Sequence, residues 1–280
     1  AVTRPARPTL RSARPDDLAW LGPLYEQSGF GARLAGVVGF ARARLDGEVV
    51  VAEAGGELVG VAAGAVFTGT GWVGGVAVVP GHRRAGLGGA LTEAIVEFLE
   101  GRGVTTVLLH ATALGRPVYE RLGFVPEAAY LTLTGPTRPP SPGDPSLRAG
   151  RQSDLETVLA LDLAATGEDR RRLLTALWPT GGLVAAGDGR LLGYHLASPW
   201  RSGGAVIATD PEAGRVLLDA VRVAPGDEVG ISVPAANTPA VQSLESAGFS
   251  ERYRTVRMHR GPRVPWNPAA LFGAHNLFWG

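Results

Sequence analysis

The chain is 280 residues long, above the roughly 100 to 150 residues of a typical domain, so its length predicts two domains. Its 27 basic and 26 acidic residues nearly cancel, which argues against a dedicated nucleic-acid-binding protein. All 27 basic residues are Arg, so lysine Schiff-base chemistry is excluded, and the lack of Cys excludes disulfides, thiolate metal sites and a cysteine nucleophile.

The N-terminal stretch AVTRPARPTLRSARPDD is too polar for a signal peptide, and no apolar run approaches the roughly 18 residues of a membrane span. We therefore expect a soluble cytoplasmic protein that has no membrane or nucleic-acid partner and binds no metal.

Elements near the N-terminus recur later in the chain. The matching residues are Leu10-Arg11, Arg14 and Asp17-Leu18 with Leu147-Arg148, Arg151 and Asp154-Leu155, and Gly123-Phe124 with Gly248-Phe249. Between them, VAEAGGELVGVAAG from Val51 parallels VAAGDGRLLGYHLA from Val184, and both patterns predict strand, turn and strand. The preserved order favours a duplicated domain over chance repetition of short matches.

A glycine-rich loop follows the strand predicted over residues 74–79, and apolar residues at helical spacing predict a helix over 87–100. Gly86, Gly88 and Gly89 leave the N–H groups of the helix start open to a ligand, and the helix dipole favours a pyrophosphate. A plain connecting turn is the alternative. A Walker A loop is excluded because the chain has no Lys, and a dinucleotide fingerprint does not fit the glycine spacing.

The segment VAVVPGHRRAGLGGAL, Val76 to Leu91, resembles the coenzyme A signature Gln/Arg-x-x-Gly-x-Gly/Ala of the GCN5-related N-acetyltransferase (GNAT) superfamily. The resemblance implies acetyl-CoA as the acyl donor. It also implies that the loop holds the pyrophosphate while the strand pairs with the pantetheine arm, through Val76, Val78, Arg83, Arg84, Ala85, Gly86, Leu87 and Gly88. The implied fold class is α/β (α+β), with two tandem GNAT-like domains, each a mixed, mostly antiparallel central sheet flanked by helices.

A strand is predicted over residues 104–110 and a short helix over 116–122. The stretch Thr112 to Phe124 resembles the last strand and helix unit of the same family, which implies coenzyme contacts at Thr112, Gly115 and Tyr119. The resemblance makes Tyr119 the candidate general acid for the departing thiolate, since a phenol is a proton donor at neutral pH. Packing in the core is the alternative role for this side chain.

The general base is harder to predict, because many family members have a carboxylate on the strand before the loop and residues 70–79 contain none. His110 ends the neighbouring strand and titrates near neutrality, so it is a candidate base, although a lone His at a strand end is often structural. Glu26 and Glu53 are weaker candidates. An amine that is already neutral needs no strong base.

The stretch GPTRPPSPGDPS, which contains five prolines, predicts an extended linker. We therefore expect a GNAT domain over residues 1–135, a linker over 136–146, and a degenerate GNAT-like domain over 147–280. In this second half the loop reads DPEAGR, with Asp210 and Glu212 where a phosphate needs donors, and Leu244 stands at the position of Tyr119. Asn237 is either a residue typical of the family at this position or simply a helix cap.

The second half is expected to shape the acceptor pocket, with Tyr194, His195 and Trp200 as lining candidates or, by default, as core residues. The aromatic stretch 266–280 should dock on a domain or on a second copy in a homodimer. The leading hypothesis is transfer of acetyl from acetyl-CoA to an amine of a small molecule or protein. A coenzyme-binding sensor or scaffold without turnover, and an enzyme for longer acyl donors, are the alternatives.

Overall fold

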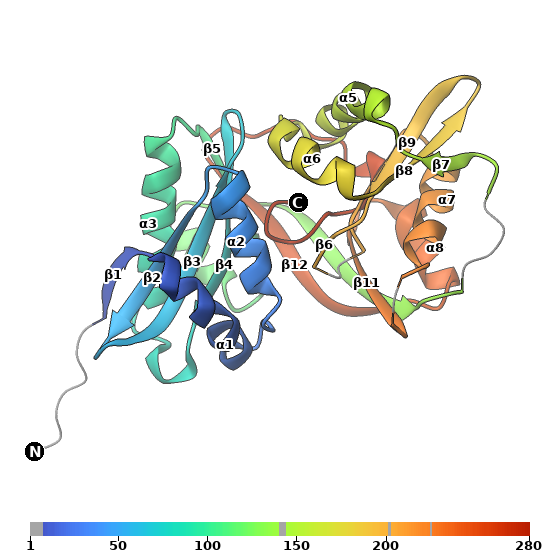
Figure 1. Ribbon diagram of the computed structural model, residues 1–280. Coiled ribbons are helices and arrows are strands. Elements are labelled where there is room, and N and C mark those ends of the chain that lie inside the picture. Colours follow the sequence, from blue (N-terminus) through green and yellow to red (C-terminus); the bar gives the residue numbers. More distant parts are fainter. Residues whose placement is uncertain (1–7, 140–143, 201–202, 225) are drawn as a thin grey trace, which may run out of the picture.

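The computed structural model describes residues 8–139, 144–200, 203–224 and 226–280, and Figure 1 shows their arrangement as two α/β units side by side. Residues 140–143 of the predicted linker lie outside the described residues. No helix within the described ranges is both long and apolar enough to cross a membrane.

In the first half, the predicted strand-turn-strand unit, strand-loop-helix unit and strand-helix unit occur in the predicted order. Its elements are β1 (Thr9–Ser12), α1 (Leu18–Ser28), α2 (Leu34–Arg44), β2 (Glu48–Ala54), β3 (Glu57–Val66), β4 (Thr70–Val78), α3 (Leu87–Gly101), β5 (Thr106–Ala111), α4 (Arg116–Arg121) and β6 (Val125–Pro136). The apolar stripe of α3, including Leu91, Ile95 and Leu99, covers one face of the sheet, and α1 and α2 lie on the other face.

The second half repeats this order. Its elements are β7 (Leu147–Ala149), α5 (Leu155–Thr166), α6 (Arg171–Leu177), β8 (Gly182–Gly187), β9 (Arg190–Leu196), β10 (Ala205–Ala208), α7 (Pro211–Val221), β11 (Glu228–Pro234), α8 (Thr238–Ser246), β12 (Ser250–Arg260) and β13 (Leu271–Gly273). The mixed, mostly antiparallel sheets flanked by helices confirm the predicted fold class.

The repeated Arg and Asp positions build the same local structure in both halves. Arg11 donates two hydrogen bonds to Asp17, at 2.5 and 3.1 Å, and Arg148 donates two to Asp154, at 2.7 and 2.9 Å. Each aspartate also accepts the backbone N–H three residues earlier, at 2.6 and 2.7 Å. The sequence match therefore reflects a shared clamp that fixes the first strand against the turn that leads into the first helix.

The two halves exchange their last long strands. One sheet has the order β1-β2-β3-β4-β5-β12-β6-β11, so β12 from the second half lies between β5 and β6, and β6 lies between β12 and β11. Both strands run through the middle of the molecule (Figure 1). Each half therefore completes its sheet with a strand of the other, and the predicted boundary at 136–146 marks a division in the sequence that the sheet itself crosses.

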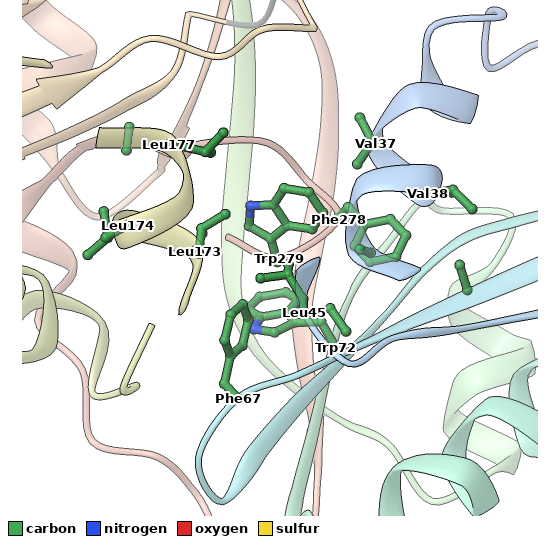
Figure 2. Packing of buried hydrophobic residues seen from close by; sticks show 14 of the residues in the cluster. Val37, Val38, Leu45, Phe67, Trp72, Leu173, Leu174, Leu177, Phe278 and Trp279 are labelled. Atoms are coloured by element: carbon green, nitrogen blue, oxygen red, sulfur yellow. The ribbon is translucent and has the colours of Figure 1, made fainter. Parts of the chain in front are cut away.

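The aromatic stretch after β12 packs between the halves. Trp279 is fully buried and lies against Phe40 of α2 and Trp200 of the second half, with ring centroids 5.9 and 5.6 Å apart. Figure 2 shows Phe278 and Trp279 between the leucines of α6 and the valines of α2. The chain's own fold thus covers these rings, and no second copy is needed for that purpose.

Candidate active site

Strands β4 and β5 pair only at their beginnings. Their parallel ladder joins Thr70–Trp72 to Thr106–Leu108, and beyond it no described strand pairs between the rest of β4 and the end of β5. We call this unpaired stretch, Val73–Val78 facing Leu109–Ala111, the β4–β5 gap. It leaves backbone N–H and C=O groups of β4 without a neighbouring strand.

A β-bulge shapes the β4 side of this gap. Val61 and Ala63 of β3 pair with Ala77 and Gly74, so β4 carries an extra residue, and Gly75 there has φ 60°. The hydroxyl of Tyr25 donates to Gly75 O at 2.9 Å and fixes the bulge. Beyond it, Val79 N donates to Val59 O at 3.0 Å.

Antiparallel strands alternate the direction of their backbone groups. Because Val79 and Ala77 face β3, the N–H and C=O groups of Val78 and Val76 face the gap. The two valines predicted to contact the coenzyme are therefore placed along the open edge of β4.

The loop that follows presents a row of free amides. Among the described residues, no hydrogen bond is donated by the backbone N–H groups of residues 84–89, and the ladder of α3 begins with Ala90 N to Gly86 O at 3.1 Å. Gly86 precedes the helix with φ 80°, and a Cβ added at Gly86 or Gly88 would meet no atom within 4 Å. Open space and unpaired N–H groups at the positive end of a fifteen-residue helix are features that favour an anion.

The two arginines of the loop have different roles. Arg83 donates to Val78 O at 2.9 Å and to Ser28 O at 3.2 Å, so its side chain ties the loop to β4 and to the end of α1. Arg84 is exposed and has φ 64°, which costs a non-glycine residue roughly 1 kcal/mol or more. Its guanidinium has no partner within the described part of the chain and remains available to an anion.

Helix α4 brings Tyr119 to this region. Val118 lies 3.6 Å from the position of a Cβ on Gly89, so α4 contacts the start of α3. Tyr119 packs on the same apolar cluster as Val76 and Val78. Burial raises its pKa to about 12, so the phenol stays protonated and can donate a proton.

The turn before α4 is built by the other two residues predicted there. Thr112 Oγ1 accepts from Gly115 N at 3.2 Å, and Thr112 O accepts from Arg116 N at 2.9 Å. Thr112 and Gly115 thus set the start of α4, and with it the position of Tyr119.

His110 is not suited to the role of general base that the sequence suggested. Both ring nitrogens are buried without a hydrogen-bond partner in the described chain, while the ring stacks on Trp72 at 5.3 Å and meets the edge of Tyr130 at 4.5 Å. Burial, and then the nearby Arg257, lower its pKa to about 3. His110 therefore binds protons weakly and serves as an aromatic packing residue.

The weaker candidate bases are also engaged elsewhere. Glu26 accepts Ala32 N at 2.9 Å in the turn between α1 and α2, and Glu53 pairs with Arg11 at 2.7 Å. The structure brings together β4, the loop and α4. Among the described residues, no hydrogen bond links His110, Glu26 or Glu53 to Tyr119 or to the loop.

The corresponding gap of the second half, between β10 and β11, is filled by the chain itself. Strand β13 pairs with β10, through Val206 with Gly273 and Ile207 with Leu271, and Ala274 N donates to Ser232 O of β11 at 2.8 Å. Phe272 packs onto α7 so closely that a Cβ on Gly214 would lie 2.3 Å from its ring. We call Leu271–Ala274 the filling segment.

The residues of the second half that match the candidate site of the first half cap helices, hold this segment or pack in the core. Asp210 caps α7 by accepting Ala213 N at 3.0 Å, so the helix start already has its anion. Asn237 caps α8 and donates to Leu271 O at 2.8 Å. Leu244, at the position of Tyr119, is a buried core residue.

The three lining candidates of the second half are packing residues in the structure. Tyr194 is fully buried and donates to Asp162, and a ring nitrogen of His195 lies 2.9 Å from Gly203 O. Trp200 reaches the first half, where its Nε1 lies 2.8 Å from the position of a Cβ on Gly36 of α2. Trp200 therefore contacts the first half.

One charged residue that the sequence did not indicate reaches β4 from the second half. Glu168 lies between α5 and α6 and accepts hydrogen bonds from Thr70 Oγ1 and Trp72 Nε1, both at 2.9 Å. No local pattern signals a contact across almost a hundred positions of sequence. The only hint is the missing carboxylate on β4 itself.

Comparisons with known proteins find the same family in both halves. Two models described as acetyltransferase (GNAT) domain match residues 45–126 and 158–273. An uncharacterised N-acetyltransferase of Bacillus subtilis, YitH, is 27% identical over 176 residues, and the match spans 60% of this chain and 62% of that relative's length.

Solved structures extend the likeness to both halves. A crystal structure of a putative acetyltransferase from Pyrococcus horikoshii has a TM-score of 0.83 at 20% identity and covers 98% of this chain and 96% of its own. A tandem GNAT protein from the clavulanic acid biosynthesis pathway has a TM-score of 0.60 at 16% identity and covers 92% of this chain and 100% of its own. At such identities these structures establish the fold. With a GNAT domain in each half, the chain belongs to the GCN5-related N-acetyltransferase superfamily of acyltransferases, as a tandem GNAT protein.

Proposed function

We propose that the first half binds acetyl-CoA in the β4–β5 gap and transfers its acetyl group to an amine. The observation that carries the proposal is the row of free amides at residues 84–89, which opens onto empty space next to the unpaired edge of β4. A pyrophosphate matches the amides and the charge of Arg84, and an extended pantetheine amide arm matches a strand edge.

Different residues of the first half bind different parts of the donor. The amides from Arg84 to Gly88 bind the pyrophosphate, and Val76 and Val78 offer backbone groups to the arm. The thioester supplies an activated acetyl carbon, which an amine attacks. Arg83 and Tyr25 act indirectly, because they fix the loop and the bulge between which the donor lies.

Tyr119 is the proposed general acid. A pKa near 12 keeps its proton in place at neutral pH until the departing sulfur develops negative charge. Its place on α4, beside the start of α3, puts the phenol near the end of the gap that the donor arm enters.

We propose that the second half binds no coenzyme and instead completes the fold and the acceptor side. Its gap is occupied by the filling segment, and its helix start is capped by Asp210. The acceptor is an amine of a small molecule or a protein that enters on the face of the sheet shared by both halves.

Calorimetric titration with acetyl-CoA, followed by detection of released thiol with a panel of primary amines, tests the proposal. We expect one equivalent of coenzyme per chain and thiol release that depends on the amine. Tight binding without transfer to any amine would instead favour a coenzyme sensor, and a stronger response to propionyl or longer thioesters would favour a different acyl donor.

A further inference from the structure

A buried carboxylate of the second half is fixed to the strand that carries the donor. Glu168 is 2% exposed, and one of its oxygens, Oε2, takes both hydrogen bonds from β4, from Thr70 and Trp72. The next residue, Asp169, bridges to Thr68 at the β3–β4 turn. The loop between α5 and α6 therefore lies on β4 through specific contacts, and its carboxylate has little freedom to move.

The position of Glu168 coincides with the start of the β4–β5 gap. Trp72 pairs with Leu108 in the last rung of the β4–β5 ladder, so the atom that donates to Glu168 belongs to the residue just before the strands separate. A small cavity lies beside Trp72 and Glu168. Its walls include Trp72, Tyr130, Glu168, Arg170, Arg257 and Trp266.

The second oxygen of Glu168 is left with space and without a hydrogen bond in the described chain. Among the described residues, the one cationic nitrogen within 4.0 Å of Oε1 is Arg257 Nη2, at 4.0 Å, beyond hydrogen-bond distance. Arg257 is itself occupied by Glu127 and by the ring of Trp266, 4.5 Å from its guanidinium carbon. Oε1 is thus the free acceptor atom of an otherwise paired cluster.

The surroundings favour a proton on this carboxylate more than water does. Burial raises the pKa of Glu168, while Arg257 of β12 and Arg170, which precedes α6, lower it only in part. Other ionisable groups near this cluster are Glu127 and Tyr130 of β6, His110 of β5, whose pKa burial lowers, and Asp162 and Tyr194, which interact with Arg170. A carboxylate with a raised pKa is a better proton acceptor at neutral pH than an exposed one.

We infer that Glu168 is the proton acceptor for the amine, supplied by the second half to the site of the first half. The inference rests on the proposed function. It explains why β4 needs no carboxylate of its own, because Thr70 and Trp72 of that strand hold one that comes from another element.

The proton balance is as follows. The ammonium form of the acceptor gives one proton to Glu168 Oε1, through a water molecule in the cavity. The free amine nitrogen then bonds to the thioester carbon, the C–S bond breaks, and the nitrogen loses a second proton as the sulfur gains one from Tyr119. Glu168 returns its proton to solvent, and Tyr119 regains one from the nitrogen, so the net products are the amide, the free thiol and one proton.

Two probe amines separate this role from a structural one. Ethylamine is protonated at neutral pH and needs a base, whereas methoxyamine is already neutral. For the full-length Glu168→Gln protein, which keeps an oxygen for Thr70 and Trp72, we expect transfer to ethylamine to fall about 100-fold or more. Transfer to methoxyamine should fall much less, and the KM for acetyl-CoA should not change.

The pH profile gives the second measurement. In the wild type, kcat/KM with ethylamine should be level above the pKa of Glu168 and fall below it in an acidic limb, because the protonated acid accepts no proton. In Glu168→Gln only the free amine reacts, so the level region and its acidic limb should be replaced by a steady rise with pH through the neutral range. Glu127→Gln is the matched control, since Glu127 is equally buried and bound to Arg257 but does not line the cavity. It should lose stability and keep the limb.

Each result has a definite meaning. A Glu168→Gln protein that loses activity equally with both amines, or that keeps the level region and its acidic limb, would overturn the assignment of Glu168. The proposed function would remain in place. A wild type that binds acetyl-CoA and acetylates neither amine nor any other acceptor would overturn the proposed transferase itself, and the role of Glu168 with it.

Discussion

The two halves treat the same gap in their sheets in opposite ways. In the first half the edges of β4 and β5 are bare and the helix after β4 begins with free amides. In the second half the gap between β10 and β11 holds the filling segment, and an aspartate caps the helix. The second half has thus kept the shape of the gap and satisfied its backbone groups internally.

The proposed lack of coenzyme binding in the second half needs no deformation of the fold. A strand in the gap forms the hydrogen bonds that an extended ligand would form, and a ring of Phe272 fills the space against Gly214. The comparison therefore predicts that the difference between the halves lies in a few residues, which mutations can test one at a time.

The largest effect is expected from a negative charge placed at the start of α3. Gly86→Glu should weaken acetyl-CoA binding at least about 100-fold, because the carboxylate stands where the helix start attracts an anion and the residue must also adopt φ 80°. Calorimetric titration measures the affinity. Asp210→Ala in the second half is the control: it should leave the affinity unchanged and lower stability by about 1 kcal/mol, the usual cost of a lost cap. Unchanged affinity in Gly86→Glu would place the coenzyme elsewhere.

Emptying the filled gap should cost stability rather than activity. Phe272→Ala removes a ring that is 1% exposed, and we expect the free energy of unfolding in urea to fall by about 3 to 5 kcal/mol. Titration of this variant should still give one acetyl-CoA per chain. A second equivalent would mean that the second gap is a competent site held closed by its own segment.

Tyr119→Phe should lower kcat with acetyl-CoA and an amine by about 100-fold and leave the KM for acetyl-CoA unchanged, because only proton donation is lost. The wild type should show no basic limb from this residue, since a pKa of about 12 keeps it protonated. Leu244→Tyr, which introduces a phenol at the matching position of the second half, should give no added turnover. Equal kcat in the wild type and Tyr119→Phe across pH would remove Tyr119 from the mechanism.

The smallest expected effect is on stability, and it should be the same in both halves. Asp17→Asn and Asp154→Asn should each cost about 1 kcal/mol of stability near neutral pH, because each loses a charge-assisted clamp to an arginine. Hydrogen bonds from Arg11 and Arg148 lower the two pKa values from 3.8 to about 2. The ionised pairs stabilise fully above the unfolded value, and this contribution disappears as the pH falls towards 2. Urea unfolding between pH 7 and 2 measures the stability difference between the wild type and each variant. Both differences should shrink together as the pH falls, and a difference seen for only one variant would mean that the clamp stabilises only that half.

The sequence predicts well those features that depend on near neighbours. The glycines before α3, the apolar stripe of that helix and the Arg–Asp repeat all act within a few residues, and the structure places α3 at Leu87–Gly101, close to the predicted 87–100. The glycine-rich loop before this helix could be predicted because it is a local feature of the sequence, where Gly86 adopts φ 80°.

Features that depend on distant partners could not be predicted. The pattern of β12 is equally compatible with either sheet, so its place between β5 and β6 is decided by pairing and not by local preference. Aromatic residues after Trp266 indicated that this stretch is buried, but not that Leu271–Gly273 adds a strand to β10. For His110, chemical type suggested a base, and only the rings of Trp72 and Tyr130 around it show otherwise.

The exchange of β6 and β12 also bears on how the chain folds. Ala111 of β5 pairs with Val256, 145 positions later (256 minus 111), so the first sheet stays open until almost the whole polypeptide has been synthesised. Until then β5 and β6 present bare edges that invite pairing with another molecule. Separately expressed halves should therefore assemble with one another, or each with its own copy, by supplying the strand that a lone half lacks. In this sense the two domains form one obligate pair carried on a single chain.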